Sequence, residues 1–240
     1  MTSIEYRYSA RPTRNPFRYL LAVWRLIRND PEEMTSEAAI VEMGFARSPR
    51  GRRYARWEEA VESLKADPRT APAMHARKAF GPIVLEDLEQ LPEGTLGRVF
   101  ADHCRARKID PNLIHIPPTD EVGWFLNHLY QTHDIWHVLT GWGNDIAGEV
   151  GVAGFYSAQF GAPPFFGYML ALILLNTVIR RGNLREIFTA FSTGYQTGKR
   201  AQPLFGVDWN PLWDVPIVEL RARFAIDQSG LIGEGIRAAA

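Results

Sequence analysis

The stretch VGWFLNHLYQTHDIWHVL at residues 122–139 decides the fold, because it reads as one long helix. A Pro-rich loop precedes it and ends in Thr119, Asp120 and Glu121, which together are typical of a helix N-terminus. We therefore predict a helix from about Val122 to about Leu139. Alternating segments bounded by turns are scarce elsewhere, so a parallel sheet has nothing to be built from.

Two upstream segments carry the same helical pattern. Residues 54–66, YARWEEAVESLKA, place their apolar side chains on one side, and a second helix is expected to begin near Gly94 or Thr95. No linker divides the chain. We predict an all-α fold, a single-domain multi-helix bundle over residues 1–240 with an apolar interior that accommodates a lipid, and a frayed tail at 228–240.

Charge and cysteine content narrow the function classes. The 240 residues hold 27 Lys plus Arg and 27 Asp plus Glu, and proteins that bind nucleic acid usually carry a basic excess. The single cysteine, Cys104, allows no internal disulfide and is expected to be a small core residue. Any metal must therefore be held by His, Asp or Glu.

The first thirty residues are basic and amphipathic. They contain six Arg against Glu5 and Asp30, with an apolar stripe at helical spacing formed by Phe17, Leu20, Leu21, Trp24 and Ile27. Such a helix either joins the core or lies on an anionic membrane surface, and we expect the core. The Arg bias is also compatible with a weak organelle-targeting peptide, although a clear one is not visible.

The segment PPFFGYMLALILLNTVIRR at 163–181 is apolar on nearly every face. Its fifteen most apolar residues span about 22 Å as a helix, which is short of a bilayer core of about 30 Å. We therefore expect no transmembrane span. The segment is either a central core helix, which we favour, or the lining of a lipid site.

The chemistry is concentrated in HDIWHVLTGWGNDIAGE at 133–149. On a helix, His133 and His137 lie about 40° apart, and Asp134 falls in the same region of the surface. Glu149 lies twelve residues beyond His137, and only a bend brings it back. Glycines at 141, 143 and 148 provide one. Two imidazoles and two carboxylates suit zinc, or iron or manganese.

Two other interpretations of this motif stay open. The four side chains also fit a polar cluster satisfied by hydrogen bonds inside a bundle. Alternatively, His133-Asp134 is the HD dipeptide of metal-dependent phosphohydrolases, with His103 or His115 and Asp208 as the remaining ligands, although their surroundings carry no matching signal.

The motif resembles that of the ubiquinone (coenzyme Q) biosynthesis proteins numbered four in the Coq series, H-D-x-x-H, eleven residues, then E. Three further blocks resemble the family in the same order, over about residues 90–226. They are LPEGTLGR at 91–98, TGKRAQPL at 197–204, and the set Trp213, Pro216 and Glu219-Leu220-Arg221. Lys199 departs from the Arg of the family's pattern.

The resemblance implies an all-helical peripheral membrane protein with a divalent metal, usually zinc, held by His133, Asp134, His137 and Glu149. It implies a metal-dependent oxidative decarboxylase that replaces the C1 carboxyl of a polyprenylated benzenoid precursor by hydroxyl. Other ubiquinone biosynthesis proteins are the implied partners. The implied location is the cytoplasmic face of a bacterial inner membrane or the matrix face of the mitochondrial inner membrane. The sequence leaves the oligomeric state open, a homo-oligomer included.

For the substrate, we expect the apolar segment to shelter the prenyl tail and basic residues to face an acidic head group. The predicted contacts are Phe165, Phe166, Met169, Leu170, Ile173, Lys199 and Arg200. The alternative function is a prenyl-lipid-binding scaffold without turnover, whose metal is structural. The remaining histidines, His75, His103, His115 and His128, are expected at the surface or hydrogen-bonded in the core.

Overall fold

The computed structural model describes residues 8–9, 17, 20, 21, 24, 56–116, 118–161 and 164–231. The described part is helical, which confirms the all-α prediction. Its helices are α4 (Trp57–Ala66), α5 (Ala71–Ala76), α6 (Leu85–Leu88), α7 (Leu96–Arg107), α8 (Glu121–Thr140), α9 (Ile146–Gln159), α10 (Pro164–Ile179), α11 (Leu184–Arg200) and α12 (Ile217–Arg223), with a 3₁₀ turn at Asn210–Leu212. Two two-residue strands, β1 (Tyr8–Ser9) and β2 (Ile114–His115), pair in parallel.

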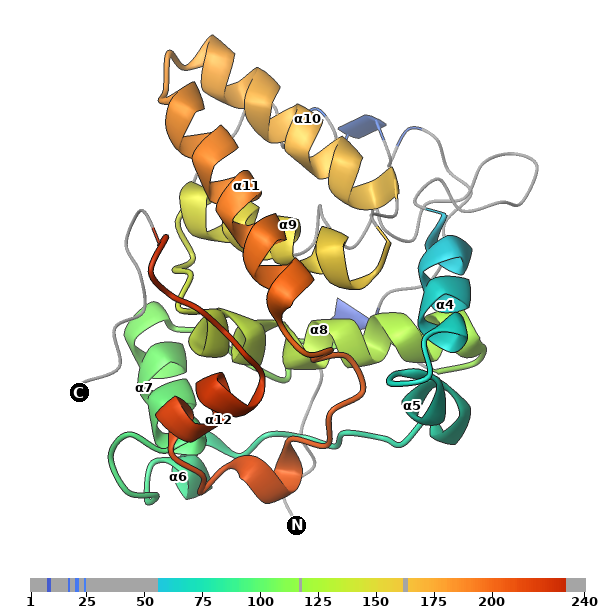
Figure 1. Cartoon of the computed structure of the whole chain (residues 1–240), viewed down its shortest axis with the longest axis vertical. Helices are drawn as coiled ribbons and strands as arrows, with labels where there is room; N and C mark the ends of the chain where they lie inside the picture. Colours follow the sequence, from blue (N-terminus) through green and yellow to red (C-terminus); the bar gives the residue numbers. More distant parts are fainter. Residues whose placement is uncertain are drawn as a thin grey trace.

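Helix α8 crosses the middle of the molecule (Figure 1). Helices α9, α10 and α11 lie on one side of it, and α6, α7 and α12 on the other. Asp120 caps α8, its carboxylate accepting from the Gly123 amide at 2.6 Å. The helix ends at Gly141, whose φ of 83° is the left-handed conformation that glycine adopts readily. The predicted boundaries of this helix are therefore confirmed to within one residue.

The family-like blocks at 91–98 and 213–221 meet in space. The Leu96 amide donates to the Val215 carbonyl at 2.9 Å, and the Gly97 amide donates to the Trp213 carbonyl at 2.8 Å. Thr95 caps α7, as its predicted start requires. In the second block, the Arg221 guanidinium donates to two carbonyls at the end of α8, those of Val138 and Leu139, at 3.0 Å each. These blocks hold α7 and α12 against the rest of the bundle.

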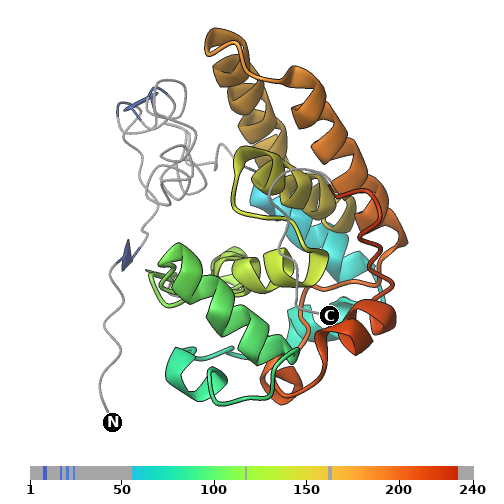
Figure 2. The ribbon, with the colours of Figure 1, turned by 90° about the vertical axis from the view of Figure 1, so that its left-hand side faces the viewer.

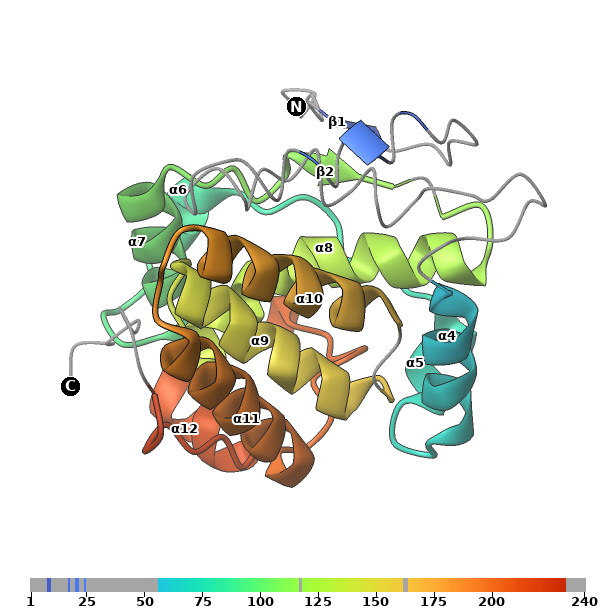
Figure 3. The same cartoon turned by 90° about the horizontal axis from the view of Figure 1, so that it is seen from above.

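Helices α9 and α11 pack backbone to backbone. A Cβ added at Gly194 would lie 1.9 Å from the Gly151 carbonyl oxygen, and one added at Gly154 would lie 2.3 Å from that of Phe191. Viewed from above, α10 lies outside this pair (Figure 3), and Figure 2 shows α10 and α11 side by side beyond α9. Helix α9 is thus enclosed between α8 and α11.

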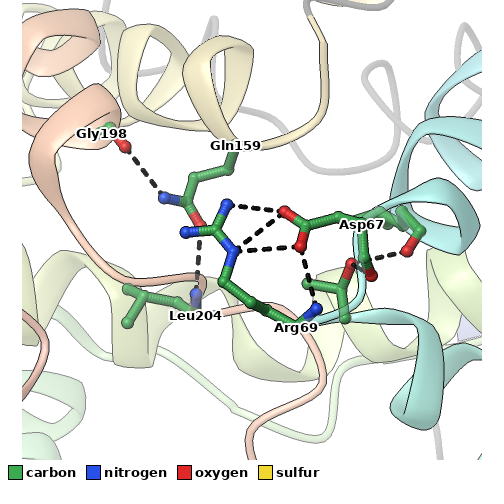
Figure 4. A network of polar contacts seen from close by, with 7 residues as sticks. Asp67, Arg69, Gln159, Gly198 and Leu204 are labelled. Carbon is green, nitrogen blue, oxygen red and sulfur yellow. Dashed lines mark hydrogen bonds and ion pairs between the residues drawn. The ribbon is translucent and has the colours of Figure 1, made fainter.

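Gln159 fixes the far ends of α9 and α11 (Figure 4). Its amide nitrogen donates to the Gly198 carbonyl, and its amide oxygen accepts from the Leu204 backbone, both at 3.0 Å. The same view shows Arg69 paired with Asp67, at 2.6 Å, in the turn between α4 and α5. The Gln159 side chain therefore links the end of α9 to the end of α11 and to the segment that follows α11.

Helix α10 departs from the expectation of a central core helix. Tyr168, Leu175, Val178 and Ile179 are 44–58% exposed, so one apolar face of the helix points to solvent. The buried face carries Phe165, Phe166 and Ile173, but also Asn176 and Thr177. The Thr177 hydroxyl donates to the Ile173 carbonyl at 2.7 Å, as expected for a helix-internal hydrogen bond. Among the described residues, no helix is both long and apolar enough to cross a bilayer.

The N-terminal stripe also departs from expectation. Phe17, Leu20, Leu21 and Trp24 are 45–78% exposed, so they do not join the core. Ile27 and most of the basic segment lie outside the described residues, as does the end of the predicted tail, 232–240. Cys104 is fully buried, as expected of a core residue.

Candidate metal centre

Three predicted ligands converge between α8 and α9. His133 and His137 come from successive turns of α8, and Glu149 comes from the first turn of α9. The two Nε2 atoms lie 3.1 Å apart. Glu149 Oε2 lies 3.6 Å from His133 Nε2, and Glu149 Oε1 lies 3.5 Å from His137 Nε2. Within the described ranges, these three form the group of His, Cys, Asp and Glu side chains suited to holding an ion.

The return of Glu149 depends on a tight glycine-containing turn, as the sequence predicts. Helix α8 ends at Gly141, and Asp145 caps α9 by accepting from the Gly148 amide at 2.7 Å. A Cβ at Gly148 would lie 1.8 Å from the Gly143 carbonyl oxygen, so only glycine fits there. The turn therefore reverses the chain within a few residues and places the first turn of α9 beside the last turns of α8.

The other nitrogen of each imidazole is hydrogen-bonded. His137 Nδ1 lies 3.0 Å from the Trp142 carbonyl, so it carries a proton and donates, which leaves Nε2 as the nitrogen that would bind a metal once it is deprotonated. His133 Nδ1 lies 3.0 Å from the Tyr156 hydroxyl. Outer hydrogen bonds of this kind fix the ring orientation of metal-binding histidines. Tyr156 and the Trp142 carbonyl were not predicted, because nothing in their spacing marks them.

The cluster holds a strongly coupled charge pair when no metal is bound. Burial lowers the pKa of His137, but the charge and hydrogen bond of Glu149 outweigh burial and raise it to about 9. Burial raises the pKa of the Glu149 carboxyl, but the charges and hydrogen bonds of His137 and His133 lower it well below its usual value. Glu149 is therefore a carboxylate at neutral pH, in the form that binds a cation.

The donor set fits a divalent ion. In tetrahedral zinc sites with metal–ligand distances of about 2.0–2.2 Å, the ligand atoms lie roughly 3.3–3.6 Å from one another. The three separations here are 3.1, 3.5 and 3.6 Å, close to such edges. The His133 side chain is 32% exposed and that of Glu149 21%, so solvent reaches one side of the cluster. Two imidazoles and one carboxylate with an open side suit zinc, iron or manganese.

Asp134 is not among the three converging side chains. It follows His133 on α8, half-buried, and its negative charge helps to raise the pKa of His137. Its role as a fourth ligand stays a prediction.

His103 corrects an expectation. Its side chain is buried on α7, but its Nε2 has no hydrogen-bond partner among the described residues, so it is not a satisfied core histidine. Burial is the main cause that lowers its pKa to about 4, with the charges of Asp134 and His137 acting in opposite directions. His103 is therefore a neutral imidazole within electrostatic reach of the cluster. Ligand spacing cannot reveal it, because it comes from another helix.

Aromatic rings connect the cluster to α10. The Tyr156 ring stacks on that of His133, with centroids 5.8 Å apart, and on that of Phe166, with centroids 5.5 Å apart. Of the predicted substrate contacts, Phe165, Phe166 and Ile173 are buried, and Met169 and Leu170 are half-buried against the core. Phe166 is therefore connected to the predicted ligand His133 through the Tyr156 ring.

The two predicted basic contacts lie elsewhere. Lys199 and Arg200 are exposed at the end of α11. Arg200 lines a polar hollow of about 270 Å³ with Asp227 and Ser229. Neither residue is part of the ligand cluster.

Comparison with known proteins places this chain in a family. Residues 51–229 match the family described as "Coenzyme Q (ubiquinone) biosynthesis protein Coq4". The mitochondrial ubiquinone biosynthesis protein COQ4 homolog of Rattus norvegicus is 26% identical over 171 residues, covering 69% of this chain and 63% of the relative. The COQ4 protein of Eremothecium gossypii is 33% identical over 147 residues, covering 59% of this chain and 44% of the relative.

A solved structure has the same fold. The crystal structure of a Nostoc punctiforme protein attributed to ubiquinone biosynthesis superposes with a TM-score of 0.72 at 27% identity, covering 90% of this chain and 100% of that one. The chain spans less than two thirds of the length of the two curated relatives described above. With most of its length matched and its fold shared, the chain belongs to the Coq4 family of coenzyme Q biosynthesis proteins.

Proposed function

We propose that this chain acts in ubiquinone biosynthesis as a metal-dependent oxidative decarboxylase. The substrate would be a polyprenylated benzenoid precursor, whose C1 carboxyl leaves as CO₂ and is replaced by hydroxyl, with the oxygen atom and oxidant supplied from outside the chain. The observation that carries the proposal is the convergence of His133, His137 and Glu149 with one side open to solvent. A structural zinc site is normally closed by four protein ligands.

The residues have separate roles in this proposal. His137, whose Nδ1 donates to the Trp142 carbonyl, and His133, oriented by Tyr156, present their Nε2 lone pairs to the ion. Glu149 supplies the negative charge. Zinc is the first choice, with iron or manganese as alternatives. When bound, the ion supplies positive charge that binds a carboxylate or phenolate and stabilises the charge that develops as CO₂ departs.

The prenyl tail would lie along the inner side of α10. Phe166, which stacks on Tyr156, supports this placement because it continues the aromatic contacts that begin at His133. Each buried methylene of a tail contributes about 0.8 kcal/mol. The predicted contacts of Lys199 and Arg200 with an acidic head group stay a prediction.

The outer side of α10 supports peripheral membrane binding. The exposed apolar band consists of Tyr168, Leu175, Val178 and Ile179 on α10 and of Leu184 and Phe188 at the start of α11. Exposed apolar side chains that gather in a patch are typical of a membrane or protein contact. We propose that it rests on the cytoplasmic face of a bacterial inner membrane or the matrix face of the mitochondrial one, near other ubiquinone biosynthesis proteins. The same band favours the alternative, a prenyl-lipid-binding scaffold without turnover.

The test is conversion of a prenylated hydroxybenzoate by metal-loaded protein, followed by mass spectrometry of the product and by metal analysis. We expect about one ion per chain and loss of CO₂ with gain of a hydroxyl. Glu149→Gln removes one ligand charge and should lower both metal content and turnover by roughly 10- to 100-fold or more. The exposed Glu86→Gln is the matched control and should change neither.

Asp134→Asn separates the two roles of that residue. A metal loss as large as that of Glu149→Gln identifies Asp134 as a direct ligand, and a smaller loss identifies a charged neighbour. A metal-loaded protein that leaves the substrate untouched while a prenyl lipid copurifies contradicts the decarboxylase and supports the scaffold. Full metal content in Glu149→Gln contradicts the proposed site itself.

A further inference from the structure

The turn that joins α10 to α11 has exposed apolar side chains on both of its sides. Four of them are 36–58% exposed: Val178 and Ile179 at the end of α10, and Leu184 and Phe188 at the start of α11. Leu184 and Phe188 are four residues apart, so they share one face of α11. Figures 1 and 2 show this turn at the outer edge of the molecule, far from α12. The turn therefore presents apolar surface to solvent at one end of the fold.

The same turn is basic. Residues 164–200 contain one acidic residue, Glu186, whereas three arginines lie at the turn: Arg180, Arg181 and Arg185. All three are exposed, and Arg181 and Arg185 form no ion pair within the described ranges. Because the whole chain has as many acidic as basic residues, this positive charge is a local feature.

Helix electrostatics account for two of these arginines but not for the third. The C-terminal end of a helix carries partial negative charge, which favours Arg180 and Arg181 directly after α10. The N-terminal end carries partial positive charge, which disfavours the cation of Arg185 in the first turn of α11. Glu186 does not compensate for it, because adjacent residues of a helix do not face each other. The position of Arg185 therefore favours a negatively charged partner outside the chain.

The backbone of the turn is hydrogen-bonded on both sides. The Gly182 amide donates to the Thr177 carbonyl at 2.8 Å, a bond typical of the Schellman motif at a helix end. The Asn183 side chain accepts from the Glu186 amide at 3.3 Å and so caps α11. Unpaired backbone groups are what makes irregular chain costly in an apolar medium. With these bonds made, the turn can approach the apolar part of a bilayer while it stays folded.

We propose that the α10–α11 turn docks on a bilayer surface that contains anionic lipids. The inference rests on the membrane contact of the proposed function, to which it adds the class of lipid and the segment that meets it. The apolar side chains enter the boundary between headgroups and acyl chains, and the guanidinium groups stay at the level of the lipid phosphates and donate hydrogen bonds to them. A second copy of this chain fits less well, because a two-fold contact through the turn would bring the arginines of both copies together.

The test is flotation of the full chain with two kinds of vesicle. One kind is phosphatidylcholine alone, and the other is phosphatidylcholine and phosphatidylglycerol in about equal amounts. At low salt we expect binding to the anionic vesicles to be at least about 10-fold tighter, because the arginines interact with the negative surface. High salt should remove most of this difference, since it screens exposed charges.

Two pairs of substitutions separate charge from position. Arg181→Gln with Arg185→Gln should weaken binding to anionic vesicles roughly 10- to 30-fold and leave binding to neutral vesicles unchanged. The control, Arg77→Gln with Lys78→Gln, removes the same charge just after α5, at the opposite end of the molecule, and should change neither (Figure 1). Arg77 also matches Arg181 in backbone conformation, with φ of 45° and 56°.

The apolar part is tested by Ile179→Ser with Phe188→Ser, which should weaken binding to both kinds of vesicle by roughly 10-fold or more. Unchanged circular dichroism and metal content show that each variant is folded.

The inference is overturned if both kinds of vesicle bind the chain equally, if the arginine variant binds anionic vesicles as well as the unaltered chain does, or if the serine variant loses a dimer and not vesicle binding. Equal binding to both vesicles leaves the membrane contact of the proposed function standing. Failure to bind either kind overturns that contact as well. The decarboxylase is assayed apart from all of these results, with its substrate in detergent.

Discussion

Helices α9 and α10 are both apolar, yet they lie in opposite environments. Helix α9 is enclosed, with its side chains packed between α8 and α11. Helix α10, the more apolar of the two, exposes Leu175, Val178 and Ile179 and turns Asn176 and Thr177 inward. Hydrophobicity therefore does not determine which helix becomes central in this chain.

Glycine spacing explains the difference. Gly154 on α9 and Gly194 and Gly198 on α11 leave no room for a Cβ, because each faces a backbone carbonyl of the other helix, so the two backbones approach closely. Helix α10 has a single glycine, Gly167, and a Cβ there would meet nothing within 4 Å. Close backbone approach, rather than apolar content, selects the partner of α11.

The largest effect is expected when the closely packed Gly194 is replaced by alanine, with the uncrowded Gly167 as the comparison. Gly194→Ala puts a Cβ 1.9 Å from a backbone carbonyl oxygen, which cannot move as a flexible side chain does. We expect a loss of at least about 4 kcal/mol in the free energy of unfolding, measured in urea. Gly167→Ala should instead stabilise the chain by about 0.5–1 kcal/mol, because alanine favours a helix interior. Equal effects at both positions would contradict the comparison.

The next largest effect is a pH dependence of the free energy of unfolding that involves helix α9 and not helix α10. In metal-free protein the pKa of His137 is raised from 6.5 to about 9, because the charge of Glu149 outweighs burial. The raised pKa stabilises the fold fully below about pH 6.5, and that contribution is lost as the pH rises through about 9. The loss amounts to roughly 3 kcal/mol.

Urea unfolding of metal-free protein at about pH 6 and about pH 9.5 measures this loss. The lowered pKa of Glu149 adds stability above its ordinary value of 4.5, which is lost as the pH falls through its folded-state pKa. Hydrogen-exchange protection, corrected for the intrinsic rise of exchange with pH, should fall at the first turn of α9 and not in α10. Glu149→Gln should abolish the alkaline loss, and an unchanged profile in that variant would contradict the assignment.

The smallest effect compares the two faces of α10. Ile173 is buried and Ile179 is 58% exposed, although they lie six residues apart on one helix. Ile173→Ala should lower the free energy of unfolding by about 2 kcal/mol, because it leaves a cavity. Ile179→Ala should change it by less than about 0.5 kcal/mol. Similar losses would show that the outer face is covered in solution.

The sequence predicts the parts of this molecule that depend on local signals. Asp120 and Thr95 mark helix starts, and the glycines after Thr140 predict the turn that returns Glu149 to the two imidazoles. Three of the four predicted ligands converge as the spacing requires. These features follow from helical geometry and turn chemistry within a few residues.

Other features depend on contacts between distant segments and could not be predicted. The exposure of α10 follows from glycine contacts between two other helices. The unsatisfied nitrogens of His103 and His128 follow from what surrounds each ring, which residue spacing does not reveal. The same holds for Tyr156, which orients His133 from 23 residues away.

The Arg221 contacts have a consequence for the end of the chain. Its guanidinium donates to the buried carbonyls of Val138 and Leu139, in the last turn of α8 after His137. Helix α12 therefore stabilises the C-terminal end of helix α8, although the two are far apart in the sequence. Truncating the chain before α12 would remove the donor of these two backbone carbonyls, which lie next to His137. A change at the carboxyl-terminal end of the chain would therefore affect the ligand cluster.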